Sequence, residues 1–407
     1  MRKTHRRYAH DMRMLQGVLV GLCVIGYASV AGAQVLQQQT ATATAAAAAP
    51  PAQSSTPKEQ PSTYDRIWTD FTQWYKNDKN TVIQQVLFTG RFQYDLAAVS
   101  ADQGDHDEAN IRRVRFGPRV TFLRQYLGHV EVEVNPQERD PFYVRLTDAY
   151  VQWNKSPKFA VTVGKQAAPF TNEGATSSKE LLTIDRSIIG QDIWFPQEYM
   201  PGVSVSGKIA PWNYRFGVYS SGAMNREFGE FNGGGFLLAV VGYDFAKKLG
   251  MKEALVTGNY VYQDPNLNNT FTRPNQQVAS VWTRFEADNW GVRTDLDVSQ
   301  GYLGQSDMWG WMVMPFYNFT NRLQGVTRIT HLSSADPNGL RPTGYEARVV
   351  PGRGDEFNEF YIGANYYFYG QKLKVQTGVQ LDDMKDRAND GGAYSGVSWT
   401  TGLRVGW

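Results

Sequence analysis

The sequence is poor in cysteine and, after its first segment, in long hydrophobic runs. The single cysteine among 407 residues, Cys23, lies in an N-terminal apolar segment. A chain without that segment could form neither a disulfide nor a cysteine-based metal site. The longest later apolar run, near residues 236–241, falls far short of the roughly 18 residues of a membrane-spanning helix. If the mature protein crosses a membrane, it has to use strands.

A strong excess of charge of one sign is also absent. The formal net charge is +2, but residues 1–33 contain five basic residues and one acidic residue. Removing these from the totals of 41 and 39 leaves 36 basic and 38 acidic residues, a net charge of −2. This charge balance argues against a protein that binds nucleic acid. Any preference of the protein for anions therefore has to come from the local placement of its cationic residues.

Residues 1–33 have the features of a secretory signal peptide. A basic start precedes an apolar run over residues 15–30, and Ala-Gly-Ala at 31–33 supplies a small-x-small cleavage pattern. A membrane anchor is the alternative, but the run is short for a membrane span. Residues 34–63 consist largely of Ala, Pro, Gln, Ser and Thr, which predicts a flexible low-complexity linker.

Residues 64–80 predict a short amphipathic periplasmic helix, with Ser62 or Thr63 as its cap. The helix could associate with other subunits, lie against the membrane or block a channel mouth. Packing against the rest of the fold is an equally open interpretation. The bulky residues at helical spacing are Ile67, Trp68, Phe71, Trp74 and Tyr75.

From residue 81 to residue 407 the sequence alternates with a period of two. In its last segment, Val397, Trp399 and Leu403 alternate with small or polar residues. About sixteen such segments predict an all-β fold, a transmembrane antiparallel β-barrel of about 16 strands. A soluble sandwich would show the same alternation, with a dry core and a wet exterior. The signal peptide, the strand number and the aromatic residues near strand ends favour the barrel.

The predicted connections alternate in length, as in outer-membrane barrels with short periplasmic turns and long outer loops. The longest in the first half, residues 167–201, carries both charged and apolar side chains. We expect this loop to fold into the barrel and constrict it, because a loop this long is usually functional or disordered. Residues 100–111 are also predicted to be an outer loop.

Cations follow one another along the predicted strand 112–123 and would form a ladder on one wall of a pore, as in anion-selective channels. Alternatively, they pair with acidic residues of the next strand as cross-strand neighbours. The candidate lining residues of the anion pathway are Arg112, Arg113, Arg115, Arg119, Lys165, Lys179, Arg186 and Arg293. The candidate opposing acidic wall is Glu131, Glu133, Asp295 and Asp297.

No pattern indicates catalysis or a metal. The acidic runs 102–108 and 382–386 could hold divalent cations that bridge lipopolysaccharide, but neither matches a calcium-binding loop. The five histidines show no metal-ligand spacing, and no serine or acidic dyad has a base with a local signature. We therefore expect no catalytic residues, no metal, no cofactor and no enzymatic activity.

Several motifs between residues 110 and 222 are specific enough to suggest a family. They are Arg-Arg-Val-Arg at 112–115, Leu-Thr-Asp-Ala-Tyr-Val at 146–151, Val-Gly-Lys-Gln at 163–166, Pro-Phe at 169–170, Thr-Ser-Ser-Lys at 176–179, Asp-Arg-Ser at 185–187 and Pro-Gly-Val at 201–203. This set resembles the phosphate-selective porin O and P family of Gram-negative outer-membrane porins. The resemblance implies a sixteen-stranded, usually trimeric channel for small anions.

The resemblance also implies roles for particular residues. Arg112 and Arg113 look like the arginines of that family's lumen ladder, and the loop after Phe170 looks like its constriction loop. The family's dense set of lysines and arginines is not evident here, so selection of phosphate stays open. The terminal aromatic residue, Trp407, is similar to the assembly signal of outer-membrane proteins.

The resulting prediction is an outer-membrane channel for passive diffusion of small hydrophilic solutes, with a preference for anions. The expected location is the bacterial cell outer membrane, reached by Sec-type export. The expected partners are lipid and lipopolysaccharide, the barrel-assembly machinery, small anions or other small solutes, and two further copies in a homotrimer. The alternative is a plugged structural or adhesive barrel whose loops bind partners, with residues 64–80 as a possible plug.

Overall fold

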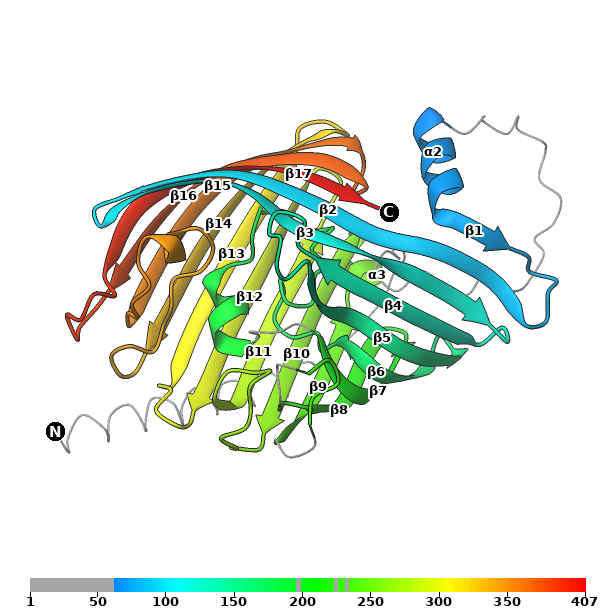
Figure 1. Cartoon of the computed structure of the whole chain (residues 1–407), viewed down its shortest axis with the longest axis horizontal. Helices are drawn as coiled ribbons and strands as arrows, with labels where there is room; N and C mark the ends of the chain where they lie inside the picture. Colours follow the sequence, from blue (N-terminus) through cyan, green and yellow to red (C-terminus); the bar gives the residue numbers. More distant parts are fainter. Residues whose placement is uncertain (1–61, 195–198, 223–225, 231–233) are drawn as a thin grey trace.

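The computed structural model describes residues 62–194, 199–222, 226–230 and 234–407. The predicted signal peptide and residues 34–61 of the predicted linker lie outside this part. Sixteen antiparallel strands, β2 to β17, form a barrel that closes where β17 pairs with β2 (Figure 1). Among the described residues, no helix is long and apolar enough to cross a membrane.

The barrel strands follow one another in sequence order around the wall, each paired with the next. They are β2 (Ile83–Ala101), β3 (Gly104–Phe122), β4 (Tyr126–Val134), β5 (Tyr143–Ser156), β6 (Phe159–Ala167), β7 (Tyr199–Ile209), β8 (Trp212–Ser220), β9 (Gly235–Asp244), β10 (Glu253–Gln263), β11 (Asn275–Glu286), β12 (Trp290–Gly301), β13 (Met308–Asn318), β14 (Leu323–Ser334), β15 (Glu356–Tyr369), β16 (Leu373–Lys385) and β17 (Tyr394–Gly406).

The two faces of each strand follow the alternation in the sequence. On β12, Asp295, Asp297 and Ser299 are buried inside the barrel, while Leu296 between them is exposed on its outside. Exposed aromatic and aliphatic side chains cover the outer face, as expected for a lipid-facing wall. The predicted barrel is confirmed. Examples of outward apolar residues are Trp212, Phe216, Val218, Trp290, Trp309, Ile362 and Trp399.

Short and long connections alternate, which gives the barrel a turn end and a loop end. At the turn end, three residues join β3 to β4 and two join β7 to β8. One predicted loop is wrong: residues 104–111 form the first half of β3, and Ala101 pairs with Gly104 at a tight hairpin. The acidic run 102–108 therefore lies mostly in β3. Its side chains alternate between the two faces of the strand, and Gly104 at the hairpin is the only residue in the run that marks a turn.

The N-terminal segment is a helix followed by a strand, α2 (Thr63–Thr72) and β1 (Gln73–Lys76). The helix is shorter than the predicted 64–80. Ser62 caps it by accepting a hydrogen bond from the Asp65 backbone N–H. β1 pairs with residues 85–87 of β2, beyond the point at which the pairing of β17 with β2 stops. In Figure 1, α2 lies outside the barrel wall, close to the C-terminus.

Two loops from the loop end fill part of the barrel. One joins β6 to β7 and includes η1 (Gly190–Trp194); the other, residues 335–355, joins β14 to β15 and includes η2 (Glu346–Arg348). A small helix, α3 (Ala246–Leu249), forms the turn between β9 and β10. The two loops share one hydrophobic core, whose loop members are Ala168, Phe170, Leu182, Ile188, Ile189, Ile193, Leu340, Tyr345 and Val350.

Candidate functional site: a loop inside the barrel

The inner loop, described over residues 168–194, folds into the barrel because its apolar side chains are buried there, away from water. Phe170, Ile189 and Ile193 are fully buried. Burying side chains of this size stabilises the docked loop by about 1.5–3 kcal/mol each relative to exposure. The prediction that this loop folds inward is confirmed.

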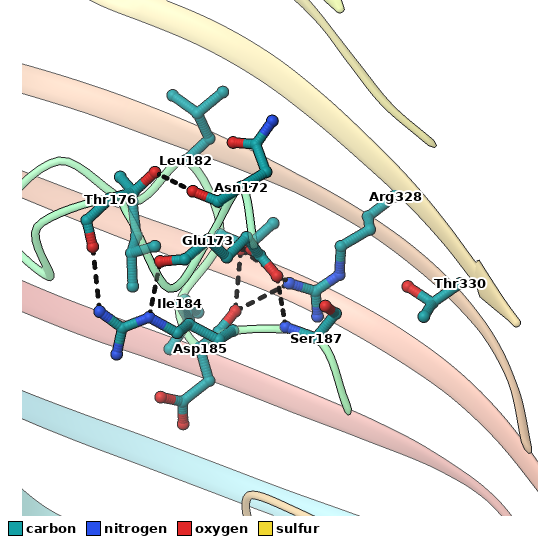
Figure 2. A network of polar contacts seen from close by, with 12 residues as sticks. Asn172, Glu173, Thr176, Leu182, Ile184, Asp185, Ser187, Arg328 and Thr330 are labelled. Atoms are coloured by element: carbon teal, nitrogen blue, oxygen red, sulfur yellow. Dashed lines mark hydrogen bonds and ion pairs between the residues drawn. The ribbon is translucent and has the colours of Figure 1, made fainter. Parts of the chain in front are cut away.

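Arg328 on β14 is the central polar anchor of the inner loop. Its guanidinium donates to both carboxylate oxygens of Glu359, at 2.6 and 3.0 Å, and to Glu173 of the loop at 3.0 Å. The second oxygen of Glu173 accepts the Ser187 backbone N–H at 2.6 Å. Figure 2 shows Arg328 reaching the loop between Glu173 and Asp185. With Arg328 only 1% exposed, the ion pairs are screened little by water.

Asn172 attaches the beginning of the loop to β11 and β12. Its backbone N–H donates to Asp295 at 2.6 Å, and its side-chain amide donates to the Thr283 carbonyl oxygen at 2.9 Å. Arg284 donates to the Asn172 carbonyl oxygen at 2.9 Å and to the Thr176 hydroxyl at 2.6 Å. This first part of the loop is therefore fixed at two adjacent strands.

The middle of the loop is attached to β16, to the residue that follows β17 and to β2, all near the closing seam. The Lys374 ammonium donates to the Leu181 carbonyl oxygen at 2.8 Å. The Lys179 ammonium donates to the Trp407 carbonyl oxygen, also at 2.8 Å. Ser178 accepts a hydrogen bond of 2.7 Å from Arg91 on β2. The loop thus spans the barrel interior, from β11 to β2.

The predicted ladder on β3 divides into two kinds of arginine. Arg115 is 1% exposed and forms an ion pair of 3.1 Å with Glu133, which also accepts from Arg145 at 2.7 Å. Arg113, which donates to Gln93 at 2.9 Å, and Arg119 are half-buried. Pairing, the alternative interpretation of this segment, therefore holds for part of the ladder.

A β-bulge explains why two consecutive arginines both reach the interior. Gln93 pairs with Arg113 and Tyr94 with Ile111, so Arg112 is the extra residue of β3. It forms an ion pair of 3.1 Å with Asp185 of the inner loop.

The other predicted lining residues are mostly engaged with protein groups. Lys165 is 4% exposed and donates to Glu227 at 2.7 Å. Arg186 stabilises the conformation of the inner loop by donating to the carbonyl oxygens of Glu173 and Thr176 in the same loop. Arg293 is half-buried, and within the described ranges its side chain forms no hydrogen bond or ion pair.

The predicted acidic wall does not face an open lumen. Glu131 is 1% exposed and pairs with Arg91 at 3.1 Å. Asp295 and Asp297 point inward, as expected, but the inner loop covers Asp295 and both residues are buried. In the structure these acidic residues are covered rather than open to a passage, and the loop residue that contacts Asp295 is more than a hundred residues away in sequence.

The sequence offered no signal for several residues of the site. Arg91, Asn172, Arg284, Arg328 and Glu359 are ordinary inward or loop polar residues until the fold brings the loop to the wall. A charged residue at an inward strand position indicates that its side chain is either buried or lines the lumen. It does not indicate which residue the side chain will contact.

The closed sixteen-stranded barrel with an inward-folded loop after its fifth strand, β6, is the architecture of the outer-membrane porins. The model of the phosphate-selective porin O and P family matches residues 86–236 of this chain, which confirms the predicted resemblance. The matched segment contains the β3 arginines and the inner loop. No curated protein sequence matches the chain.

Solved porin structures share the fold at low sequence identity. The outer membrane channel DcaP of Acinetobacter baumannii aligns with a TM-score of 0.54 and 14% identity, over 82% of this chain and 99% of that one. An anion-selective porin from Comamonas acidovorans aligns with a TM-score of 0.57 and 11% identity, over 79% and 99%. Pseudomonas putida OprB aligns with a TM-score of 0.57 and 10% identity, over 85% and 96%.

Proposed function

We propose that the protein is an outer-membrane channel for passive diffusion of small hydrophilic solutes, with a preference for anions. The fold, the family match and the name of the anion-selective relative support this function. The proposal assigns the protein no enzymatic role. The constriction is the inner loop, and solutes pass between it and the wall from β3 to β8, which carries half-buried arginines.

The unequal exposure of inward charges carries the anion preference. Arg113 and Arg119 on β3, Arg145 on β5 and Arg215 on β8 are inward and half-buried, so water reaches part of each. The inward acids of β4 and β5 are at least nine-tenths buried: Glu131, Glu133 and Asp148. Water-accessible cations attract anions into a low-dielectric passage, whereas Glu131 and Glu133 are paired with arginines and repel anions only weakly.

The reversal potential of the refolded protein in a planar bilayer, under a KCl gradient, tests this function. The wild-type protein should give the sign of an anion-selective pore. Arg113→Gln combined with Arg119→Gln should lower the anion-to-cation permeability ratio several-fold. Lys247→Gln, a neutralisation on the exposed turn between β9 and β10, is the matched control and should change nothing. A cation-selective sign, or equal effects of the variants, would contradict the proposal.

The shared core of the two inner loops supports a second candidate, a plugged structural or adhesive barrel. Liposome swelling separates the two functions, because a plugged barrel admits no solute. The notion that residues 64–80 form the plug has no support, since α2 contacts the outer rim of the barrel.

The finer features of the family resemblance are also proposals. We propose a homotrimer, export through the Sec pathway with residues 1–33 as the signal peptide, and contacts with lipopolysaccharide and the assembly machinery. Adding micromolar phosphate during the bilayer recording tests phosphate selection: block of the chloride current would support it, and an unchanged current would oppose it. Cross-linking in membranes followed by electrophoresis measures the oligomeric state.

A further inference from the structure

One side of helix α2 is seated on the rim of the barrel. The Trp68 indole N–H donates to the Gly406 carbonyl oxygen at 2.8 Å. Tyr64 stacks on Tyr369, with 5.4 Å between ring centroids, and the Tyr369 hydroxyl donates to Asp65. This hydrogen bond is the largest of the influences that lower the pKa of Asp65. These contacts fix the helix beside the end of β17 and the turn between β15 and β16.

A neighbouring side of the same segment presents bulky apolar groups to its surroundings. Ile67 is 54% exposed, Phe71 52% and Trp74 61%. Ile67 and Phe71 are four residues apart and lie on one helical face, and Trp74 follows in β1. We call these three residues the apolar stripe.

The apolar stripe is continuous with the outer face of the barrel. Trp74 stacks on Phe88 with ring centroids 4.9 Å apart and planes within 7°, and Phe71 meets the same ring at 5.5 Å. Phe88 lies on β2 on the opposite face from the inward Arg91, and its ring is 6.2 Å from that of Phe116 on β3. In a transmembrane barrel this outer face contacts lipid, with aromatic residues at the interface.

We propose that α2 and β1 form an interfacial membrane anchor, whose apolar stripe inserts among the acyl chains of the periplasmic phospholipid leaflet. Phospholipid is the occupant that the contacts favour, because the stripe extends a surface that faces lipid. The exposed charges of the segment are mixed, with Arg66, Asp70 and Lys76 among them, so insertion depends on apolar area rather than on lipid charge.

The anchor also protects the closing seam of the barrel. β17 ends its pairing with β2 near Arg91, which leaves the backbone of the first part of β2 without that partner. β1 pairs with residues 85–87 and covers this strand edge, which would otherwise be open to another chain. Lipid insertion of the stripe would hold β1 in place along the edge.

Site-directed spin labelling of the full-length protein tests the anchor. In a Cys23→Ser background, which removes the single native cysteine, Ile67→Cys and Thr69→Cys each receive a nitroxide. Thr69 is exposed on the same helix, about 200° around its axis from Ile67, and is the matched control. The proteins are placed in bilayers of phosphatidylcholine, and collision rates with oxygen and with a water-soluble nickel chelate are measured.

The label at position 67 should collide several-fold more with oxygen relative to nickel than the label at position 69. The difference should persist when anionic lipid is added. Equal collision profiles at the two positions would overturn the anchor. Dipolar broadening at position 67 that vanishes on dilution with unlabelled protein would also overturn it, by showing that a second copy covers the stripe. Neither result depends on whether the barrel conducts.

Discussion

Replacing Arg328 with methionine should release the inner loop from the barrel wall. Methionine fills similar space but carries no charge, so Glu173 and Glu359 would both remain buried without their partner. Glu173 is 2% exposed and Glu359 is 4% exposed, so neither can recover its hydration without movement of the loop. Removing one partner of such a buried pair costs about 3–5 kcal/mol.

This cost sets the expected change in conductance. A factor of ten in an equilibrium corresponds to about 1.4 kcal/mol, so about 3 kcal/mol lowers the ratio of docked to undocked loop roughly 100-fold. Single-channel recording of Arg328→Met should therefore show larger and noisier openings than the wild type. Arg322→Met, on the exposed turn between β13 and β14, is the matched control and should behave as the wild type does.

A compensated variant separates charge burial from loss of packing. Adding Glu173→Gln and Glu359→Gln to Arg328→Met removes the uncompensated charges and should restore part of the steady wild-type conductance. The reasoning would be refuted if Arg328→Met alone left conductance and noise unchanged. It would also be refuted if the triple variant were as noisy as the single one.

Three further results are expected. Deleting residues 177–186 should raise single-channel conductance, and an unchanged conductance would show that the inner loop is not the constriction. Asp297→Asn should raise the urea midpoint of unfolding, because Asp297 is a fully buried acid next to a second buried acid, Asp295, and forms no ion pair in the described part of the chain. Asp295→Asn should lower the midpoint by weakening the Asn172 contact. Four backbone N–H groups of residues 389–392 donate to Asp386 and lower the pKa of its carboxyl below the ordinary 3.8. Protonation of Asp386 as the pH falls below 3.8 should therefore weaken these hydrogen bonds and loosen the loop of residues 386–392. Pepsin should cut this loop at pH values where the carboxylate is protonated.

The barrel could be predicted from the sequence because each strand has its own local signal. Alternation such as that around Leu296 identifies the strand and both of its faces without knowledge of its neighbours. The inward folding of residues 168–194 was also predictable, since a long outer loop with so many apolar residues requires a site away from water. The end of α2 at Thr72 was not, because Trp74 and Tyr75 suit a helix and a strand equally well.

The partners within the site could not be predicted for a different reason. Glu173 and Arg328 are 155 residues apart, and nothing in either local sequence indicates the other. The bulge at Arg112 is a property of the pairing of β2 with β3, so a single strand does not reveal it. Whether a charged inward side chain lines water or is covered depends on where the loop lies.

The hydrogen bond from Lys179 to the Trp407 carbonyl oxygen has a consequence for the order of assembly. It joins the inner loop to the last residue of the chain, 228 residues away, beside the seam between the first and last strands of the barrel. Arg404 on β17 also pairs with Asp95 on β2 and donates to Ile184 of the inner loop. The loop can gain these contacts only after the seam has closed. In a partly assembled barrel, whose first and last strands are not yet paired, the inner loop would lack these contacts. Docking of the loop, which narrows the passage, would therefore be among the last steps of folding.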